Sequence, residues 1–335
     1  MNNIALDPPG LRPETTIADL RGWVALHAAH RDKVHSPPIR GVFRVEFEAE
    51  AASRQGEAVY RLRLYDVTGI TRAFVLANVW DGPPPTPGMV TALELNIRES
   101  HSVPHVIVEG RYPAVRSGRS HLDLLPAHLA PQPNDLSRLI HLARGLNFDV
   151  YRLFLDDAFR DLRLAVPFIT LPAGKSCHHT QPGGLLSHSV EIAEAVQRTT
   201  RCISGNPLTS DAAVLLALFH DVGKVTLAQY GERIPPQHHT DLIESELLTP
   251  LSRLRDHDMD AYSCLLHMIC CYRERRDYEN PLAAVIRGLD GWSAQTDASA
   301  GRRTVSKHDY RLKPCARSRA IWDPPHQEQR RRQLF

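Results

Sequence analysis

Histidine and aspartate residues stand at three places in the second half of the chain, each beside an apolar run. His188 lies in LLSHSVEIAEAV, and His220 and Asp221 are adjacent in LLALFHDVGK. Asp290 ends the apolar run of AAVIRGLD. Burying an adjacent His-Asp pair at the end of an apolar helix is costly unless the side chains are paired or bind a metal. Because imidazole nitrogens and carboxylate oxygens together suit Mn, Mg, Fe, Ni or Zn, the sequence predicts one divalent metal site built from these four residues.

The segments that must position these ligands have the patterns of helices. From residue 135 onward apolar residues recur at helical spacing, first in NDLSRLIHLARGL and then in FDVYRLFLDDAFRDLRLAV. Glycines before LLSHSVEIAEAV break the preceding element, which places His188 in the first turn of a helix. The segment TSDAAVLLALF, with Thr209 or Ser210 as its cap, is almost entirely apolar and must be central. We expect an all-α bundle over residues 135–299.

The N-terminal half has a different pattern, which predicts a small β-barrel. YRLRLYDVTGITRAFVLANVW alternates apolar and polar residues on both sides of a turn, as a hairpin does. GVFRVEFEAE, MVTALELNI and HVIVEGRYP add three more strands, so that five short strands are expected within residues 39–114. The fold class is therefore α+β, a barrel followed by a helical bundle, and the barrel segment resembles an OB-fold of the nucleic-acid-binding kind.

Such barrels hold single strands on exposed aromatic rings beside a basic groove. Because successive residues of a strand point to opposite faces, Arg61, Arg63 and Tyr65 share one face. These three, with Arg72 of the next strand, are the predicted substrate-binding residues. A solvated outer face without a ligand is the open alternative.

Composition and charge set the remaining bounds. The chain has 335 residues, 42% of them hydrophobic, which is enough for two cores, and its six cysteines lack the spacing of a disulfide framework or a zinc ribbon. With no signal segment and no membrane-spanning run, a cytoplasmic protein without a membrane partner is expected.

The segments around the two predicted domains have their own assignments. Residues 1–38 are an expected N-terminal extension, and residues 115–134 an expected linker. Residues 300–335 form a basic tail, with ten Lys or Arg against three Asp or Glu from Gly301 onward. That tail either contacts nucleic acid or is disordered.

The order His188, His220-Asp221, Asp290 resembles the HD superfamily of metal-dependent phosphohydrolases, and LFHDVGK is its most recognisable part. The resemblance implies that these residues bind the metal and that Asp221 also helps to deprotonate the attacking water. It implies that Lys224 contacts a phosphate oxygen.

Some HD enzymes bind a second ion through histidines between the His-Asp pair and the last aspartate. This chain offers His238, His239, His257 and His267 there. Only His267 lies within a clear apolar helix, so it is the predicted ligand of a second ion. A core histidine without a metal is the alternative.

Two groups of HD proteins look similar to this chain. LPAGKSCHHTQPGGLLSHSVEIAEAV, together with Asp290 to Ala294, resembles the TraI_2 domain of MobH-type conjugative relaxases. The YhaM-type 3′-to-5′ exoribonucleases similarly place an OB-fold before an HD domain and carry paired histidines before Gly-Gly-Leu-Leu. By this resemblance His178 and His179 line the same cleft and hold the substrate phosphate or the attacking water. Simple exposure in a Pro/Gly loop is the alternative.

These resemblances predict a metal-dependent phosphodiester hydrolase that acts on single-stranded RNA or DNA in the manner of a 3′-to-5′ exonuclease. One alternative is a relaxase-like protein that nicks DNA and works with conjugation or mobile-element proteins. Another is a nucleic-acid-binding scaffold with an inactive bundle. A third is a nucleotide phosphohydrolase.

Overall fold

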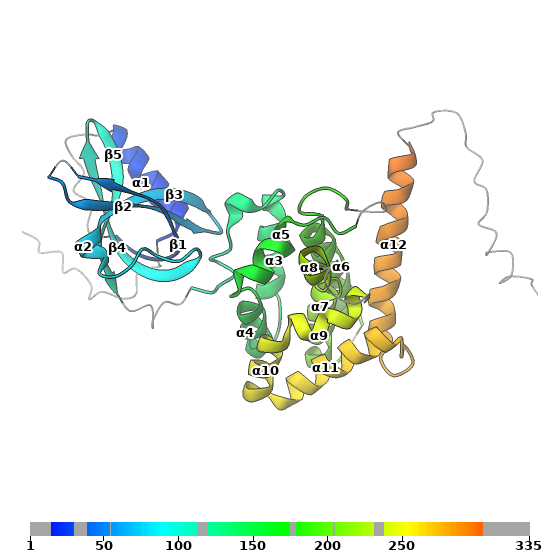
Figure 1. The fold of residues 1–335 in the computed structure, drawn as a ribbon. Helices are drawn as coiled ribbons and strands as arrows, with labels where there is room; N and C mark the ends of the chain where they lie inside the picture. The colour runs from blue at the N-terminus through cyan, green and yellow to red at the C-terminus, as the bar shows by residue number, and fades with distance from the viewer. Residues whose placement is uncertain are drawn as a thin grey trace, which may run out of the picture.

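The computed structural model describes residues 15–29, 39–53, 55–112, 119–174, 179–203, 205–230 and 238–303, with residues 296–303 as backbone only. A β-barrel and a helical domain lie side by side, and residues 119–132 connect them (Figure 1). The predicted class, a barrel followed by helices, is confirmed at this level. No helix in the described part of the chain is both long and apolar enough to cross a membrane.

The barrel is closed by five strands in the order β1-β2-β3-β5-β4. They are β1 (Ile39–Ala52), β2 (Ala58–Asp66), β3 (Gly69–Leu76), β4 (Met89–Ser100) and β5 (Val103–Tyr112). The pairs are antiparallel except for β3 with β5, which are parallel. Helix α1 (Ile17–Ala29) packs Ile17 and Leu20 into the barrel core, and the single turn α2 (Ala77–Trp80) buries Trp80 there. The described part of the expected N-terminal extension is therefore part of the barrel domain.

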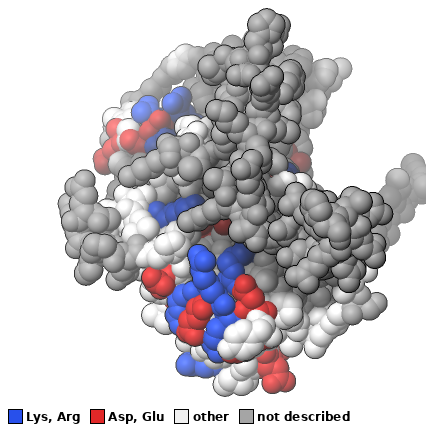
Figure 2. All heavy atoms as spheres, turned by 90° about the vertical axis from the view of Figure 1, so that its right-hand side faces the viewer, with Lys and Arg blue, Asp and Glu red and all other residues white. Residues whose placement is uncertain are grey.

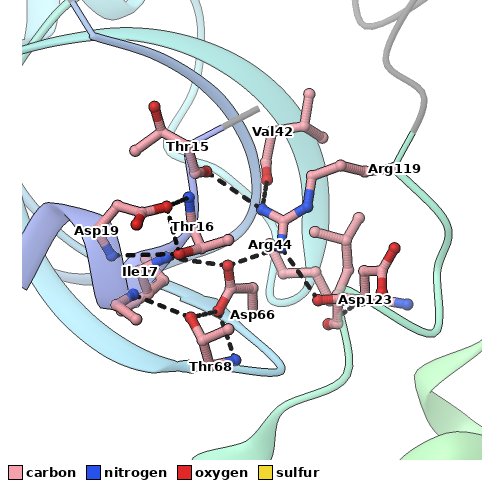
Figure 3. A network of polar contacts seen from close by, with 12 residues as sticks. Thr15, Thr16, Ile17, Asp19, Val42, Arg44, Asp66, Thr68, Arg119 and Asp123 are labelled. Carbon is pink, nitrogen blue, oxygen red and sulfur yellow. Dashed lines mark hydrogen bonds and ion pairs between the residues drawn. The ribbon is translucent and has the colours of Figure 1, made fainter. Parts of the chain in front are cut away.

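A buried carboxylate fastens α1 and the segment after the barrel to β2 (Figure 3). Asp66 is fully buried and accepts hydrogen bonds from the Ile17 N–H at 3.0 Å, from the Thr68 N–H at 2.7 Å and from Arg119 Nη2 at 2.8 Å. Arg119 also donates to the Val42 carbonyl at 2.9 Å. This charge pair is fully hydrogen-bonded, so it stabilises the fold.

The expected linker is packed rather than free where the structure describes it. Leu122, Leu124 and Leu125 are buried. Arg44 of β1 is only 2% exposed and donates to backbone carbonyls of the linker and of the helical domain, at distances of 3.1 to 3.2 Å. These carbonyls belong to Leu124, Phe159 and Arg160. A buried arginine that reaches both sides joins the barrel to the helical domain.

The helical domain packs ten α-helices, α3 to α12, around one core in its described part. They are α3 (Pro133–Arg144), α4 (Asp149–Ala158), α5 (Leu162–Thr170), α6 (Gly184–Cys202), α7 (Pro207–Phe219), α8 (Lys224–Tyr230), α9 (Ile243–Glu246), α10 (Leu248–His257), α11 (Met259–Glu274) and α12 (Pro281–Arg303). Two short 3₁₀ helices, η2 (Ala127–Leu129) and η3 (His239–Leu242), complete the described elements.

Helix α7 is buried and central, as its apolar sequence predicted. All its residues from Asp211 to Phe219 are buried, and it packs against α4, α6, α11 and α12. The prediction of its cap was wrong. Pro207 starts the helix earlier than expected, and the Asn206 side chain accepts the capping hydrogen bond from the Leu208 N–H.

Candidate metal centre

Four side chains from three segments converge within the helical domain. His188 lies on α6, His220 and Asp221 follow α7, and Asp290 lies on α12. The ligand atoms of His188, His220 and Asp290 all lie within 4.8 Å of one another. Asp221 Oδ2 is 3.7 Å from His188 Nε2 and 3.6 Å from His220 Nε2. This is a compact set of nitrogen and oxygen donors of the kind that binds a divalent transition metal.

The His220 ring is oriented so that one nitrogen faces the carboxylates. It is fully buried, and its Nδ1–H donates to the Ala217 carbonyl at 2.7 Å. Its Nε2 is 3.8 Å from Asp290 Oδ1, and it has no hydrogen-bond partner among the described residues. Metal-binding histidines are typically held in this way, with one ring nitrogen on a carbonyl and the other on the metal. An orphaned buried nitrogen beside two carboxylates therefore fits a bound cation.

Asp221 makes two further contacts that link it to neighbouring cationic groups. Lys224 Nζ is 2.5 Å from Oδ2, and His239 Nε2 is 2.9 Å from Oδ1. His239 begins η3, which packs closely on the turn after α7. A Cβ on Gly223 would lie 2.0 Å from the His239 carbonyl oxygen, so only glycine permits this approach. The glycine of HDVGK therefore brings a fifth side chain to the centre.

The Pro-Gly-Gly segment before α6 places His179 beside the same centre. Gly183 has φ +79°, a left-handed conformation, and caps α6. A Cβ on Gly184 would lie 2.0 Å from the His179 carbonyl oxygen. The His179 ring is 5.3 Å from that of His188, and its Nε2 is 3.1 Å from Glu191 Oε2. His178, the other predicted residue of this segment, lies outside the described residues.

The electrostatics keep both carboxylates ionised. Burial opposes the charge on Asp221, but His220, His239 and Lys224 hold its pKa well below the usual range. Burial also opposes the charge on Asp290, and hydrogen bonding to His188 with the proximity of His220 lowers its pKa.

The two buried histidines differ in their titration. Burial lowers the pKa of His188. It acts in the same direction on His220, but there Asp221 and Asp290 outweigh it and raise the pKa. Because a metal requires neutral imidazole, protons compete with a metal at His220.

His267, the predicted ligand of a second ion, does not lie at this centre. His267 is an exposed residue of α11, and it clusters with Cys271 and Glu279 instead of with the His-Asp pair. A lone histidine on an apolar helix carries no signal for the direction of its side chain, since the same helix also has a solvent face. His239, on a short 3₁₀ turn, had no helical pattern to indicate its place beside Asp221.

The predicted binding face of the barrel differs from the expectation. Tyr65 is only 5% exposed, and its ring packs against His128 at 5.0 Å, so it cannot stack on a base. The predicted arginines are all paired with carboxylates of β1, at distances of 2.8 to 3.1 Å. These pairs are Arg61–Glu48, Arg63–Glu46 and Arg72–Glu48. The outer face of β2 and β3 is therefore a mixed-charge surface.

Comparison with known proteins adds no assignment. No protein-family model matches this chain, and no curated protein matches its sequence. The site must therefore be interpreted from its own chemistry.

Proposed function

We propose that this protein is a metal-dependent phosphodiester hydrolase of the HD type that acts on single-stranded nucleic acid. The observation that carries the proposal is the convergence of two histidines and two aspartates from α6, from the turn after α7 and from α12, with the buried His220 Nε2 facing two carboxylates at 3.6 and 3.8 Å without a hydrogen bond in the described structure. The order of these residues along the chain is that of the HD superfamily. Nitrogen and oxygen ligands with solvent access suit phosphoester hydrolysis.

The side chains at this centre have separate tasks in the proposed reaction. A divalent ion held there would supply positive charge for phosphate oxygens and make the attacking water more acidic. His188, His220, Asp221 and Asp290 would hold that ion, and Asp221 would also accept a hydrogen bond from the attacking water. The Asp290 side chain is 36% exposed, which gives the centre access to solvent.

Three cationic or titratable groups surround the ligands and can contact the phosphate. The side chains of Lys224, His239 and His179 are 25%, 24% and 13% exposed, so each is held in place yet accessible. Asp221 orients Lys224 and His239, while Glu191 orients His179. We assign to Lys224 the neutralisation of charge that develops on the phosphate, and to the two histidines contact with its oxygens.

The topology of the barrel and its outer surface support the proposal that the substrate is single-stranded. The strand order β1-β2-β3-β5-β4 of a closed five-stranded barrel is compatible with an OB-fold. Arg61 lies opposite Phe74 on neighbouring strands, and the Phe74 ring meets that of His105 at 5.3 Å. Aromatic rings beside arginines form the kind of surface on which bases stack.

A second candidate function is the hydrolysis of small nucleotides by the helical domain. The observation that favours it is the pairing of Arg61, Arg63 and Arg72 with Glu46 and Glu48, which leaves little net positive charge on the barrel face. In that case the barrel contributes to the fold and does not bind substrate.

The deciding experiment compares substrates on the purified full chain. End-labelled single-stranded RNA and DNA, a supercoiled plasmid and nucleoside monophosphates are each incubated with Mn²⁺, with EDTA and with the His220→Ala variant. His141→Ala, which removes an exposed histidine of α3, is the control. Circular dichroism establishes that each variant is folded.

A ladder of products shortened from the 3′ end, lost with EDTA and with His220→Ala but kept with His141→Ala, supports the proposal. Release of phosphate from mononucleotides without strand cleavage supports the second candidate instead. A single nick in the plasmid points to relaxase-like chemistry. Strand binding without any cleavage overturns the assignment as an enzyme.

A further inference from the structure

We propose that the turn between α11 and α12 forms a second transition-metal site, separate from the centre above, from His267, Cys271 and Glu279. One ligand atom from each of these side chains lies within 4.8 Å of the other two. None of them belongs to the His188, His220 and Asp290 group. The inference does not depend on the hydrolase assignment, because it concerns other residues and other ligand chemistry.

Local geometry brings the three donors together. His267 and Cys271 are one helical turn apart on α11, and His267 Nε2 is 3.5 Å from Cys271 Sγ. Arg275 ends α11 with φ +57°, and the Arg276 N–H then donates to the Cys271 carbonyl at 2.9 Å. This turn reverses the chain and carries Glu279 back beside the last turns of α11.

The donor set indicates which metal the site would take. A thiolate, an imidazole and a carboxylate together suit Zn²⁺ or a similar borderline ion, whereas Mg²⁺ and Ca²⁺ prefer oxygen donors. Three protein ligands leave the fourth tetrahedral position to water. Cys271 is buried while His267 and Glu279 are exposed, so the sulfur is sheltered and the ion can enter from solvent.

The charges around the turn are balanced. Arg276 Nη1 is 2.7 Å from Glu279 Oε2, and Arg276 Nε is 3.0 Å from Glu274 Oε2. A carboxylate has two oxygens and can keep an arginine on one while the other binds a metal. At the lower end of the face in Figure 2, where Figure 1 places the turn between α11 and α12, basic and acidic side chains are interspersed.

A metal at this turn would brace the helix that carries Asp290. Tyr272 follows Cys271 in the chain, and its ring is 6.3 Å from that of His220. Arg287 of α12 stacks over the Tyr272 ring at 5.1 Å and donates to its carbonyl. The site would therefore hold the segment that leads into α12 against α11, next to the candidate metal centre.

Co²⁺ is the probe that separates the two sites, because a cysteine thiolate bound to Co²⁺ gives a near-ultraviolet charge-transfer band that a centre of nitrogen and oxygen ligands cannot give. The full chain, reduced and metal-free, is titrated with Co²⁺. We expect the band in the wild type and in the Asp221→Asn variant, with the same final amplitude, since one thiolate binds one Co²⁺ in each. The matched control is Cys270→Ser, which removes the neighbouring thiol, whose sulfur is 4.0 Å from Glu244.

Cys271→Ser should abolish the band. His267→Ala and Glu279→Gln alter exposed side chains, so they test the site without disturbing the core, and each should weaken Co²⁺ binding at least about 10-fold. The proposal is overturned by a wild-type protein with no such band, by a band that survives Cys271→Ser, or by one that depends on Cys270. A band that these two exposed-residue variants leave unchanged would also overturn it.

Discussion

Two buried aspartates, one in each domain, belong to clusters that differ in how completely their polar atoms are hydrogen-bonded. Asp66 of the barrel accepts hydrogen bonds from Ile17, Thr68 and Arg119. Asp221 of the helical domain pairs with Lys224 and His239, and Asp290 and both buried histidines lie beside it. The described polar atoms of Asp66 are hydrogen-bonded, whereas in the helical cluster the buried His220 Nε2 makes no hydrogen bond in the described structure.

The difference teaches how to distinguish a structural cluster from a functional one. A buried charge with all its hydrogen bonds made stabilises the fold and has nothing left to offer a ligand. A buried cluster with an unused donor atom and two adjacent carboxylates gains from a bound cation. We therefore expect substitutions in the barrel cluster to reduce stability, and substitutions in the helical cluster to reduce metal binding and catalysis.

The largest effect is expected from Asp221→Asn. Metal-dependent hydrolysis should fall at least about 10⁴-fold, or about 5 kcal/mol of transition-state stabilisation, because the charge that orients the water is lost. The side chain keeps its size, so the loss of unfolding free energy should be smaller than that of Asp66→Ala. Steady-state kinetics and urea unfolding measure the two quantities. Retained activity would show that Asp221 is not functional, so that the two aspartates would not differ in the expected way.

Asp66→Ala should cost about 3–5 kcal/mol of unfolding free energy, because it leaves the Arg119 charge buried and unpaired. Urea denaturation measures this loss, with Asp256→Ala on the exposed side of α10 as the control. At temperatures where the variant is folded, its activity per folded molecule should match that of the wild type. A loss of less than about 1 kcal/mol would show that the barrel network is not structural.

Metal should stabilise the folded protein through the helical cluster and not through the barrel cluster. With free Mn²⁺ at 100 times its dissociation constant, the unfolding free energy should rise by about 2.7 kcal/mol, and EDTA should reverse the rise. Asp66→Ala should keep this increment and Asp290→Asn should lose it. Because the pKa of His220 is raised without metal, lowering the pH through that pKa protonates the ring and should remove the increment. Thermal unfolding at several pH values tests this, and an increment that grows on acidification would contradict it.

His239 and His238 provide a matched pair that sharpens the comparison. His239→Ala should lower activity about 10- to 100-fold, because it removes a group that contacts Asp221. His238→Ala should have a smaller effect, since that exposed ring reaches the centre only indirectly, through its contact with the His239 ring at 4.2 Å and its hydrogen bond to Thr240. Kinetics on both variants measure the difference. Equal effects on activity would show that His239 has no specific role at the centre.

The smallest effect is expected on the outer face of the barrel. Glu48→Gln frees Arg61 and Arg72 from their shared partner, so single-stranded RNA should bind a few-fold more tightly at low salt, with a steeper salt dependence. Stability should be nearly unchanged, since exposed ion pairs contribute little to it. Fluorescence anisotropy at several salt concentrations measures the change. Unchanged affinity would favour the nucleotide phosphohydrolase.

Much of the fold could be predicted because its signals are local. Alternation of apolar and polar residues indicated the strands, and the apolar run before His220 indicated the buried α7. The helix α1 was missed, since it belongs to the barrel only through contacts with strands far along the chain. Tyr65 was misplaced for a related reason. Alternation correctly sets it apart from the barrel interior, but it says nothing of the segment after the barrel, whose His128 covers the Tyr65 ring.

The sequence by itself determined the types and the order of His188, His220, Asp221 and Asp290 and their place beside apolar helical segments. The reason is that apolar periodicity, and the free-energy cost of burying a polar pair, can both be assessed from neighbouring residues. Only the tertiary structure decided which distant side chains meet. It brought His239 to Asp221 through the close approach at Gly223, and it placed His267 with Cys271 instead. The reason is that the direction of a single polar side chain depends on the packing of whole elements, and no short stretch of sequence encodes that packing.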